Sequence, residues 1–385
     1  MADINPENYF PLGSTVETSF TDLQTSPSDP KRYEHFGIIS VNPLSGHSIL
    51  IYRKGTHHVG ANDFGSIYIR YSYDGGANWS NEAQAFPPET NIDQRGVGGG
   101  YDSSGRLFAF YGRYNPNTST WLSMNYLYSD NDGSTWSNEQ SLPTTLTGFL
   151  PYGHIIDVGN GVLYQPWYEN NFIGPLPGNL SSCRYRLNLY KSTDGGQTFT
   201  SVNIYDHTNS IQGGEQFFYT EFSLVNIGGG CFIILVRKDG YDFQEYHQFK
   251  SENNCQSWIS QGDTSFEQLG SYPAPPWLSF INYEGVGIVS CYYTNRGTQK
   301  LNVVYGLAKD LLENGPNGWN VHSPILILNY YGTLNSGYQS FFLPLNQYKG
   351  IGVGFKETDV NDIAYPVVVF TSTQSMKDVL LALGL

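Results

Sequence analysis

The side chains that could carry chemistry in this chain stand at the ends of strongly β-like runs. Lys and Arg together number only 20 among 385 residues, so arginines that recur at equivalent places in successive runs are informative. A guanidinium group can hold a carboxylate through two parallel hydrogen bonds, and carboxyl, phenol and imidazole groups beside it can exchange protons with a bound molecule. The candidates at these strand ends are His35, Arg53, Asp63, Arg95, His154, Glu221, Arg237, Arg296 and Tyr338.

These candidates are far apart in the sequence, and a repeated turn motif indicates how the fold gathers them. Residues 72–79 read Ser-Tyr-Asp-Gly-Gly-Ala-Asn-Trp, and the pattern returns at 129–136, 192–199 and 251–258, about 60 residues apart. Such a period calls for a repeat architecture. The Asp-Gly or Asn-rich centre is typical of a tight turn between strands, and the closing Trp or Phe supplies apolar surface. Nothing in the motif is reactive, so we expect it to be structural.

The stretches between these turns predict the fold class. From Arg32 onward, an apolar or alternating run, a glycine turn and a second β-like run follow one another six times, with first runs at 35–41, 95–101, 151–158, 219–225, 276–281 and 337–343. Short strands at regular spacing, closed by radial repetition, avoid exposed sheet edges. We therefore predict an all-β fold, a six-bladed β-propeller with four-stranded antiparallel blades.

The domain organisation follows from the extent of these repeats. A single propeller domain is predicted for residues 31–373, after an irregular lead-in at 1–30. Residues 374–385 form a short amphipathic pattern that is too short for a stable isolated helix and could associate with copies of itself. A fifth copy of the turn motif is degraded to residues 314–319, and a sixth copy is absent.

The turn motif resembles the Asp-boxes of the sialidase superfamily. In that family each box is a turn between outer strands of a propeller blade, on the face away from the active site. Asp-boxes also occur in propellers that are not sialidases, so the resemblance favours the fold more strongly than the function.

The resemblance extends to five of the candidate residues. Glu221 and Arg237 match the family's glutamate at the start of the fourth blade and the arginine that ends its next strand. Tyr338 matches the tyrosine at the start of the sixth blade, and Arg296 matches the arginine after the second strand of the fifth. Asp63 matches the acid/base aspartate in the loop after the second strand of the first blade.

The resemblance implies a chemistry that is physically coherent. Arg237 and Arg296 would hold the carboxylate of an acidic sugar. Tyr338, deprotonated by Glu221, would be the nucleophile, since a carboxylate nucleophile would be repelled by the sugar's own carboxylate. Asp63 would protonate the leaving oxygen and then activate water. This chemistry needs no metal and no organic cofactor.

One element of the family pattern is absent. The family's first arginine lies in a Phe-Arg-Ile-Pro sequence at the start of the first blade, where this chain has Phe-Gly-Ile-Ile at 36–39. Arg95 or His35 could project into the same space. Arg53 and His154, which also stand at predicted strand ends, complete the set of expected substrate-binding residues.

Three functions remain open at this point. The first is an exo-glycoside hydrolase of the exo-α-sialidase type, acting on a terminal acidic sugar such as sialic acid. The second is a non-catalytic glycan-binding propeller of the phage receptor-binding or adhesion type, which the missing arginine and the many aromatic residues favour. The third is a propeller polysaccharide lyase in which Tyr338 or His154 removes a proton beside a uronate carboxylate.

Composition excludes other classes of partner. A formal net charge of −14 argues against binding to nucleic-acid phosphates, which requires a basic face. No apolar run has membrane-spanning length, so we expect no membrane insertion. The first residues lack the basic start and apolar core of a signal peptide, which predicts a cytoplasmic or virion-associated protein, or a secreted one whose leader has been removed. The cysteines at 183, 231, 255 and 291 have no metal-ligand spacing, and we expect buried free thiols.

Overall fold

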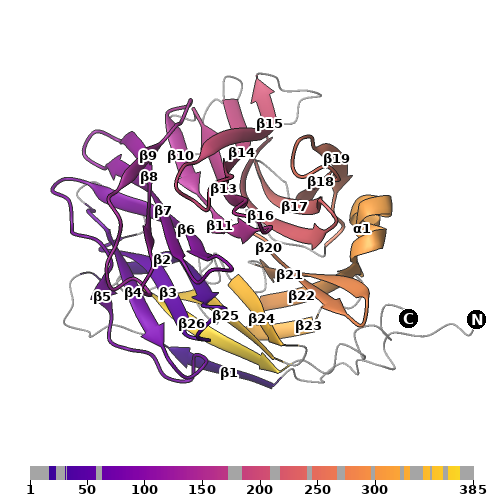
Figure 1. The fold of residues 1–385 in the computed structure, drawn as a ribbon, viewed down its shortest axis with the longest axis horizontal. Coiled ribbons are helices and arrows are strands. Elements are labelled where there is room, and N and C mark those ends of the chain that lie inside the picture. The colour runs from indigo at the N-terminus through magenta and orange to yellow at the C-terminus, as the bar shows by residue number, and fades with distance from the viewer. Residues whose placement is uncertain are drawn as a thin grey trace, which may run out of the picture.

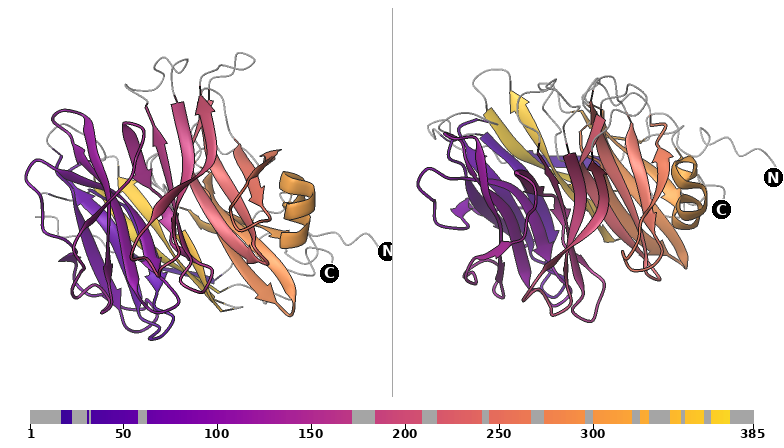
Figure 2. Two further views of the ribbon diagram at one scale, coloured as in Figure 1. Left: turned by 45° about the horizontal axis from the view of Figure 1, so that its top comes forward. Right: turned by 90° about the horizontal axis from the view of Figure 1, so that it is seen from above.

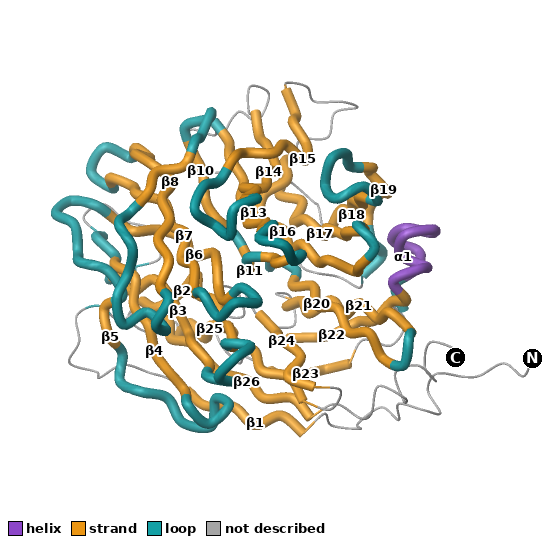
Figure 3. Tube along the Cα trace, in the orientation of Figure 1, coloured by secondary structure: helices purple, strands orange, loops and turns teal. Residues whose placement is uncertain are grey.

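The computed structural model describes residues 17–22, 31, 33–57, 63–171, 184–208, 217–240, 245–266, 274–295, 300–320, 325–329, 341–346, 349–358 and 363–372. This part of the chain is almost entirely strand and loop (Figure 3), and its sheets stand around a common centre like blades (Figure 1). The prediction of an all-β propeller with mainly antiparallel sheets is therefore confirmed.

The number of blades differs from the prediction. The described strands form five sheets, with eight, five, five, four and four strands, so the prediction of six four-stranded blades is wrong. The reason is a parallel pairing of β2 with β26 at Tyr33 and Ala364, which joins strands expected in the first and sixth units. The spatial order in this sheet is β24 (Phe341–Asn346), β25 (Lys349–Thr358), β26 (Ile363–Ser372), β2 (Tyr33–Val41), β3 (Ser48–Gly55), β4 (Ser66–Ser72) and β5 (Ala83–Gln84).

An eighth strand belongs to this sheet and comes from a segment expected to be irregular. β1 (Glu17–Asp22) pairs antiparallel with β26, in register from Glu17 opposite Ser372 to Asp22 opposite Val367. The first and the last described strands therefore support each other, a contact between chain ends that a local sequence pattern does not encode. The predicted tail at 374–385 lies outside the described residues.

The four remaining sheets follow one another along the chain. The second contains β6 (Asp93–Tyr101), β7 (Leu107–Asn115), β8 (Thr120–Ser129), β9 (Gln140–Leu142) and β11 (Gly153–His154). The third contains β10 (Gly148–Pro151), β12 (Ile156–Asp157), β13 (Leu163–Asn170), β14 (Arg184–Ser192) and β15 (Thr200–Thr208). The fourth contains β16 (Phe217–Gly228), β17 (Cys231–Gly240), β18 (Tyr246–Ser251) and β19 (Ile259–Asp263). The fifth contains β20 (Trp277–Tyr283), β21 (Val286–Asn295), β22 (Lys300–Leu307) and β23 (Ile325–Asn329).

The innermost strands meet at the centre of the ring. β2 packs against β6, β16 packs against β20, and the short β11 contacts β2, β6 and β16. β11 pairs in parallel with β6 of the second sheet, Gly153 opposite Gly98, although β10 and β12 on either side of it in the sequence belong to the third sheet. Gly100 has a φ of 115°, a conformation that residues with a side chain rarely adopt, and a Cβ atom there would also crowd Ser40 Oγ at 2.8 Å and His154 Nδ1 at 3.1 Å.

The core lies between neighbouring sheets rather than in one central mass. Phe110 of β7 shares a buried cluster with Trp167 of β13, and Leu187 of β14 shares one with Ile234 of β17. The alternating strand residues face both sides of each sheet, so every blade contributes to two interfaces. The residue pattern of β17, Cys-Phe-Ile-Ile-Leu-Val, is apolar on both faces for this reason.

One helix occupies the place of the degraded fifth turn motif. α1 (Ala308–Asn314) and the 3₁₀ turn η3 (Gly315–Gly318) follow β22 directly, and α1 lies at the outer edge of the ring (Figures 1 and 2). The buried indole of Trp319 donates from Nε1 to Gln248 Oε1 at 2.8 Å, and Leu311 joins the cluster between the fourth and fifth sheets. The helix thus replaces the packing of the turn motif.

The four complete turn motifs share one hydrogen-bond pattern. The first-position serine accepts the backbone N–H of the fifth residue, as from Gly76 to Ser72 Oγ at 2.7 Å and from Gly196 to Ser192 Oγ at 2.8 Å. The third-position Asp or Asn accepts the backbone N–H of the seventh residue, at 2.8 to 3.0 Å in all four copies. The structural role expected for the motif agrees with these bonds, which are all internal to the turn.

The turn conformation explains the glycines in the motif. Its fourth and fifth residues have φ between 55° and 90° in all four copies, the region that glycine adopts without strain. In the last copy Asn254 and Cys255 take these positions at 56° and 61°. Asn tolerates this region, and the Cys255 side chain is retained in the core between the third and fourth sheets.

We expect Ser192→Ala to lower the free energy of unfolding by about 1–3 kcal/mol, because it leaves the buried N–H of Gly196 without its acceptor. Thr193→Ala, in the same turn but exposed, should change the stability little. Asp194→Asn should also be tolerated, since Asn131 and Asn253 make the same bond in other copies. Urea unfolding of the four proteins measures this. Equal midpoints for Ser192→Ala and Thr193→Ala would contradict the assigned role.

Candidate functional site

Four of the predicted site residues lie at one end of the innermost hairpins. Arg95 is near the start of β6 and Glu221 near the start of β16, while Arg53 and Arg237 are near the ends of β3 and β17. Because β2–β3, β6–β7 and β16–β17 are antiparallel pairs, the start of the first strand and the end of the second lie side by side. The backbone of His35 is paired with that of Arg53.

Three innermost strands share a bulge at this end. The register shifts by one residue between His35 and Ile38, between Arg95 and Gly98, and between Tyr219 and Phe222. Two residues of the inner strand thus face one of its partner, the geometry of a β-bulge, which turns side chains out of the regular alternation. The two adjacent residues that form each bulge are 36–37, 96–97 and 220–221. Gly37 and Glu221 are each the second residue of their bulge, so they hold equivalent positions.

The bulge in β16 carries a buried ion pair. Arg237 Nη1 donates to Glu221 Oε2 at 2.5 Å, and both side chains are buried. Arg237 is the single residue opposite the bulged pair Thr220-Glu221. The register therefore brings together two residues that are 16 positions apart in the sequence. The positive charge of Arg237 and the negative charge of Glu221 cancel, so the pair acquires a net charge only when a further charged group binds beside it.

A second cluster surrounds Arg53, which is fully buried. Its Nη2 donates to Asp63 Oδ2 at 2.6 Å and its Nε to Asp93 Oδ1 at 2.7 Å. Arg95 reaches the other oxygen of Asp93, with Nε 3.3 Å from Oδ2. Asp63 and Asp93 are only 1% and 2% exposed, and two arginines balance the two buried carboxylates.

Aromatic rings shield the outer side of Arg95. Its guanidinium carbon lies 5.1 Å from the ring centre of Tyr114 and 6.0 Å from that of Trp121. Such cation–π contacts hold the planar group in one orientation. Sequence reasoning missed Asp93, Tyr114 and Trp121. The alternation Asp93-Gln-Arg95 at the start of a strand was the available signal, since residues two apart share a face.

Asp63 is in a state that does not suit a proton donor. Burial alone would raise the pKa of Asp63, but the Arg53 guanidinium and hydrogen bonds from Thr56 outweigh it and hold the pKa below its usual value. Thr56 donates to Asp63 Oδ1 from its backbone N–H at 2.8 Å and from Oγ1 at 2.9 Å. Both carboxylate oxygens are therefore occupied by donors, and Asp63 is ionised at neutral pH.

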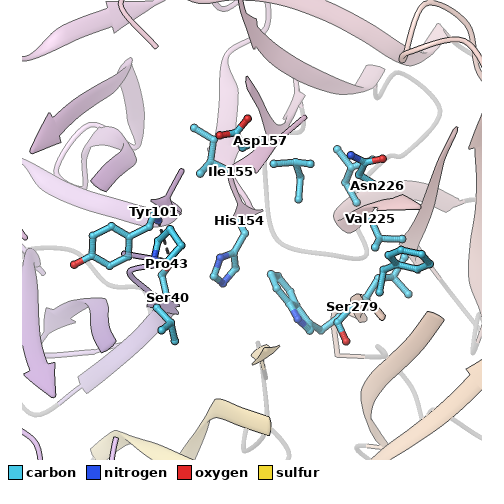
Figure 4. Close-up of a pocket in the computed structure, with 15 residues that line it drawn as sticks. Ser40, Pro43, Tyr101, His154, Ile155, Asp157, Val225, Asn226 and Ser279 are labelled. Carbon is cyan, nitrogen blue, oxygen red and sulfur yellow. Dashed lines mark hydrogen bonds between the residues drawn. The ribbon is translucent and has the colours of Figure 1, made fainter. Parts of the chain in front are cut away.

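His154 is separated from this group. It lines an axial pocket with residues near the ends of β2 and β6, such as Ser40 and Tyr101 (Figure 4), and none of the arginines above lines that pocket. Its ring makes an edge contact with Trp277, with centres 4.8 Å apart. Burial lowers the pKa of His154 to about 3, so the ring is neutral over the physiological range.

The remaining candidates are described in part or not at all. Arg296 and Tyr338 lie outside the described residues, and His35 is described only by its backbone. Within the described ranges, no group of three or more His, Cys, Asp or Glu side chains is arranged to hold a metal ion, and no helix is long and apolar enough to cross a membrane. Cys255 and Cys291 are buried free thiols, as predicted, whereas Cys231 is free but only partly buried, and Cys183 lies outside the described residues.

Comparison with known proteins identifies the family. The BNR repeat-like domain matches residues 60–272, more than half of the chain. A search of curated protein sequences found no match. The chain therefore belongs to the BNR repeat-like family, and the predicted membership of the sialidase and BNR-repeat propeller superfamily is confirmed.

Solved structures show the same fold at low sequence identity. A protein of unknown function from Dyadobacter fermentans superposes with a TM-score of 0.67 at 13% identity, covering 92% of this chain and 99% of that one. Trypanosoma rangeli sialidase gives 0.68 at 15% identity, covering 96% of this chain but 61% of its own. A mutant of the NanB sialidase from Streptococcus pneumoniae gives 0.62 at 14% identity, covering 93% of this chain and 70% of its own. The chain thus spans about three fifths of the trypanosomal enzyme.

We expect Arg53→Gln to lower the free energy of unfolding by about 3–5 kcal/mol at pH 7, because it leaves Asp63 and Asp93 buried without their shared cation. The lowered pKa of Asp63 determines how its contribution to the free energy of unfolding changes with pH. Its contribution is complete above the unfolded value of about 4 and is lost as the pH falls through the folded value.

The measurement is denaturant unfolding of wild type and Arg53→Gln between pH 7 and pH 3. The difference between them should narrow at the acid end of this range. Arg184→Gln, which removes a partly exposed arginine paired with Asp206, is the matched control and should cost little. A difference that is constant with pH would contradict the ionised state of Asp63.

Proposed function

We propose that this protein is a sialidase-like glycoside hydrolase that removes a terminal acidic sugar, sialic acid or a related one, from a glycan. The observation that carries the proposal is the buried Glu221–Arg237 pair on the bulge of β16. It joins the carboxylate and the guanidinium that this chemistry requires, at the positions expected from the family pattern. Two similar folds belong to sialidases, which supports a sugar as the ligand.

The proposed reaction has two steps. Tyr338 passes its proton to Glu221 and attacks the anomeric carbon, while the bond to the leaving oxygen breaks and that oxygen takes a proton from Asp63, which has first taken one up from solvent. Water then attacks the same carbon and gives one proton to the Asp63 carboxylate, the bond to the Tyr338 oxygen breaks, and Glu221 returns its proton to that oxygen. Arg237 and Arg296 bind the sugar carboxylate throughout.

The ion pair of Glu221 with Arg237 links binding of the acidic substrate to proton transfer from Tyr338. Arg237 donates one N–H to Glu221. Because a guanidinium has five donors, Arg237 can hold the substrate carboxylate at the same time. Two anions then share one cation. When Glu221 accepts the proton of Tyr338 it becomes neutral, and the full charge of Arg237 remains for the sugar. Binding of the acidic substrate therefore favours the proton transfer that creates the nucleophile.

Asp63 limits the acid step. As a carboxylate it is suited to activate water in the second step, but it can donate a proton only after taking one up, at the expense of its contact with Arg53. Hydrolysis should therefore increase toward acidic pH for substrates whose leaving oxygen requires protonation.

A second candidate function is a glycan-binding propeller without turnover. Two observations favour it: the occupied oxygens of Asp63, and Gly37 at the bulge position where the family has its first arginine. Both features leave carboxylate binding by Arg237 intact and weaken catalysis. The lyase alternative has no such support, since His154 lines a different pocket.

We expect purified wild-type protein to release the aglycone from at least one α-linked aryl glycoside of an acidic sugar. Glu221→Gln should lower kcat by roughly 100-fold or more, because the amide cannot accept the tyrosine proton, and Tyr338→Phe should abolish turnover. Initial rates over a range of substrate concentrations and pH values measure this.

Glu313→Gln, which changes an exposed glutamate of α1, is the matched control and should leave the rate unchanged. Binding of acidic glycans that is lost in Arg237→Ala, with no release of sugar by wild type, would favour the second candidate. Absence of both binding and release would overturn the proposal of an acidic-sugar site.

A further inference from the structure

A pocket of about 650 Å³ lies on the axis of the ring. The side chains around it come from β2, β6, β11, β12, β16 and β20 (Figure 4). Pockets that bind small molecules commonly have volumes of roughly 300–1,000 Å³, so this one has room for a ligand of one or two rings.

The pocket is at the opposite end of the inner strands from the arginine clusters. Val41 and Tyr101, the last residues of β2 and β6, line it together with Asn226, late in β16. Arg95 and Tyr101 are six residues apart on β6, which corresponds to about 20 Å along an extended strand. The pocket is therefore a separate site and does not belong to the proposed acidic-sugar site.

The repeated turns support the wall of this pocket. Asp132, in the second turn motif, accepts a hydrogen bond from Tyr101 Oη at 2.7 Å and another from Asn42 Nδ2 at 2.8 Å. On the neighbouring wall, Asp157 Oδ2 accepts from the backbone N–H and the hydroxyl of Ser103, at 2.9 and 2.6 Å. Asp157 Oδ1 accepts the N–H of Gly159 at 2.7 Å, and its second lone pair can accept a further hydrogen bond. These bonds fix the lining side chains before any ligand arrives, which reduces the entropy lost on binding.

The charge of the lining selects against anions. No Lys or Arg is among the residues that line the pocket, and Asp157 is the acidic side chain there. His154 adds no positive charge, because burial lowers its pKa to about 3. An acidic sugar would meet a negative potential here, in contrast to the arginine-rich end of the same strands.

The remaining lining combines aromatic surface with hydrogen-bonding groups. The partly exposed Phe280 offers ring surface, the almost fully buried Trp277 forms the wall near it, and Ser279 lies between them in sequence. Asn226 accepts the N–H of Gly228 through Oδ1 at 2.9 Å, and the amide hydrogens of Asn226 take part in no hydrogen bond among the described residues. An apolar face beside fixed amide, hydroxyl and carboxylate groups suits a ring with C–H faces and hydroxyl edges.

We propose that this axial pocket binds an uncharged sugar unit, at the end of the ring opposite to the acidic-sugar site. Asn226 donates to a sugar hydroxyl, Asp157 accepts from another, and the ring lies against the aromatic side chains. The proposal does not depend on whether the other end hydrolyses its substrate.

The test is saturation-transfer NMR, with titration of the methyl glycosides of glucose, galactose and N-acetylglucosamine, and with glucuronate and N-acetylneuraminate as acidic arms. At least one neutral glycoside should bind. Asn226→Asp, which removes the amide donors and adds a negative charge, should weaken that binding roughly tenfold or more, the equivalent of one lost hydrogen bond.

Asn282→Asp is the matched control, because Asn282 accepts the N–H of Gly285 through Oδ1 in a similar turn but does not line the pocket. It should bind as wild type does. Asp157→Asn serves as a second variant if Asn226→Asp does not fold, with a several-fold loss expected. The proposal is overturned if no neutral glycoside binds, or if neutral binding is equal in wild type and in the pocket variant that folds.

Discussion

The candidate site depends on one backbone irregularity that three innermost strands share. In each strand a β-bulge sets two adjacent residues opposite a single residue of the partner strand, and the bulges lie at equivalent points: 36–37, 96–97 and 220–221. A regular strand would send every second side chain into the packing between blades. The bulge breaks this alternation, so Glu221 meets Arg237 instead of an apolar neighbour. The equivalent position in the bulge of β2 is Gly37, which has no side chain to contribute to the site.

Buried arginines determine what the site can do. Arg53 and Arg237 each have a carboxylate partner within the protein, and a buried arginine without one would cost several kcal/mol. These pairs fix the side chains in the absence of ligand. They also set a condition on catalysis, because a carboxylate paired to arginine stays ionised. In the proposed hydrolysis that state suits Glu221, which would accept a proton, but does not suit Asp63, which would have to give one.

The sequence predicted the features that are local. The four turns, most inner strands and the closeness of Glu221 to Arg237 follow from turn residues, strand patterns and the family pattern. The sheet count did not follow, because the pairing of Tyr33 with Ala364 joins the chain's two ends. The position of His154 did not follow either: β11 lies between β10 and β12 in the sequence, but it pairs with β6 in the second sheet while they belong to the third. Its partners there are Gly98 and Gly99.

The two ends of the ring differ in charge because of what each strand carries at its start and its finish. The starts of β6 and β16 carry Arg95 and Glu221, and their later residues include Tyr101 and Asn226. Arg53, Arg95 and Arg237 are each paired with a carboxylate at their own end of the strands, so their charges are compensated locally. Asp157 is the charged side chain among the residues that line the axial pocket, about 20 Å away along the strand. One set of strands can thus present an anion site at one end and a neutral site at the other.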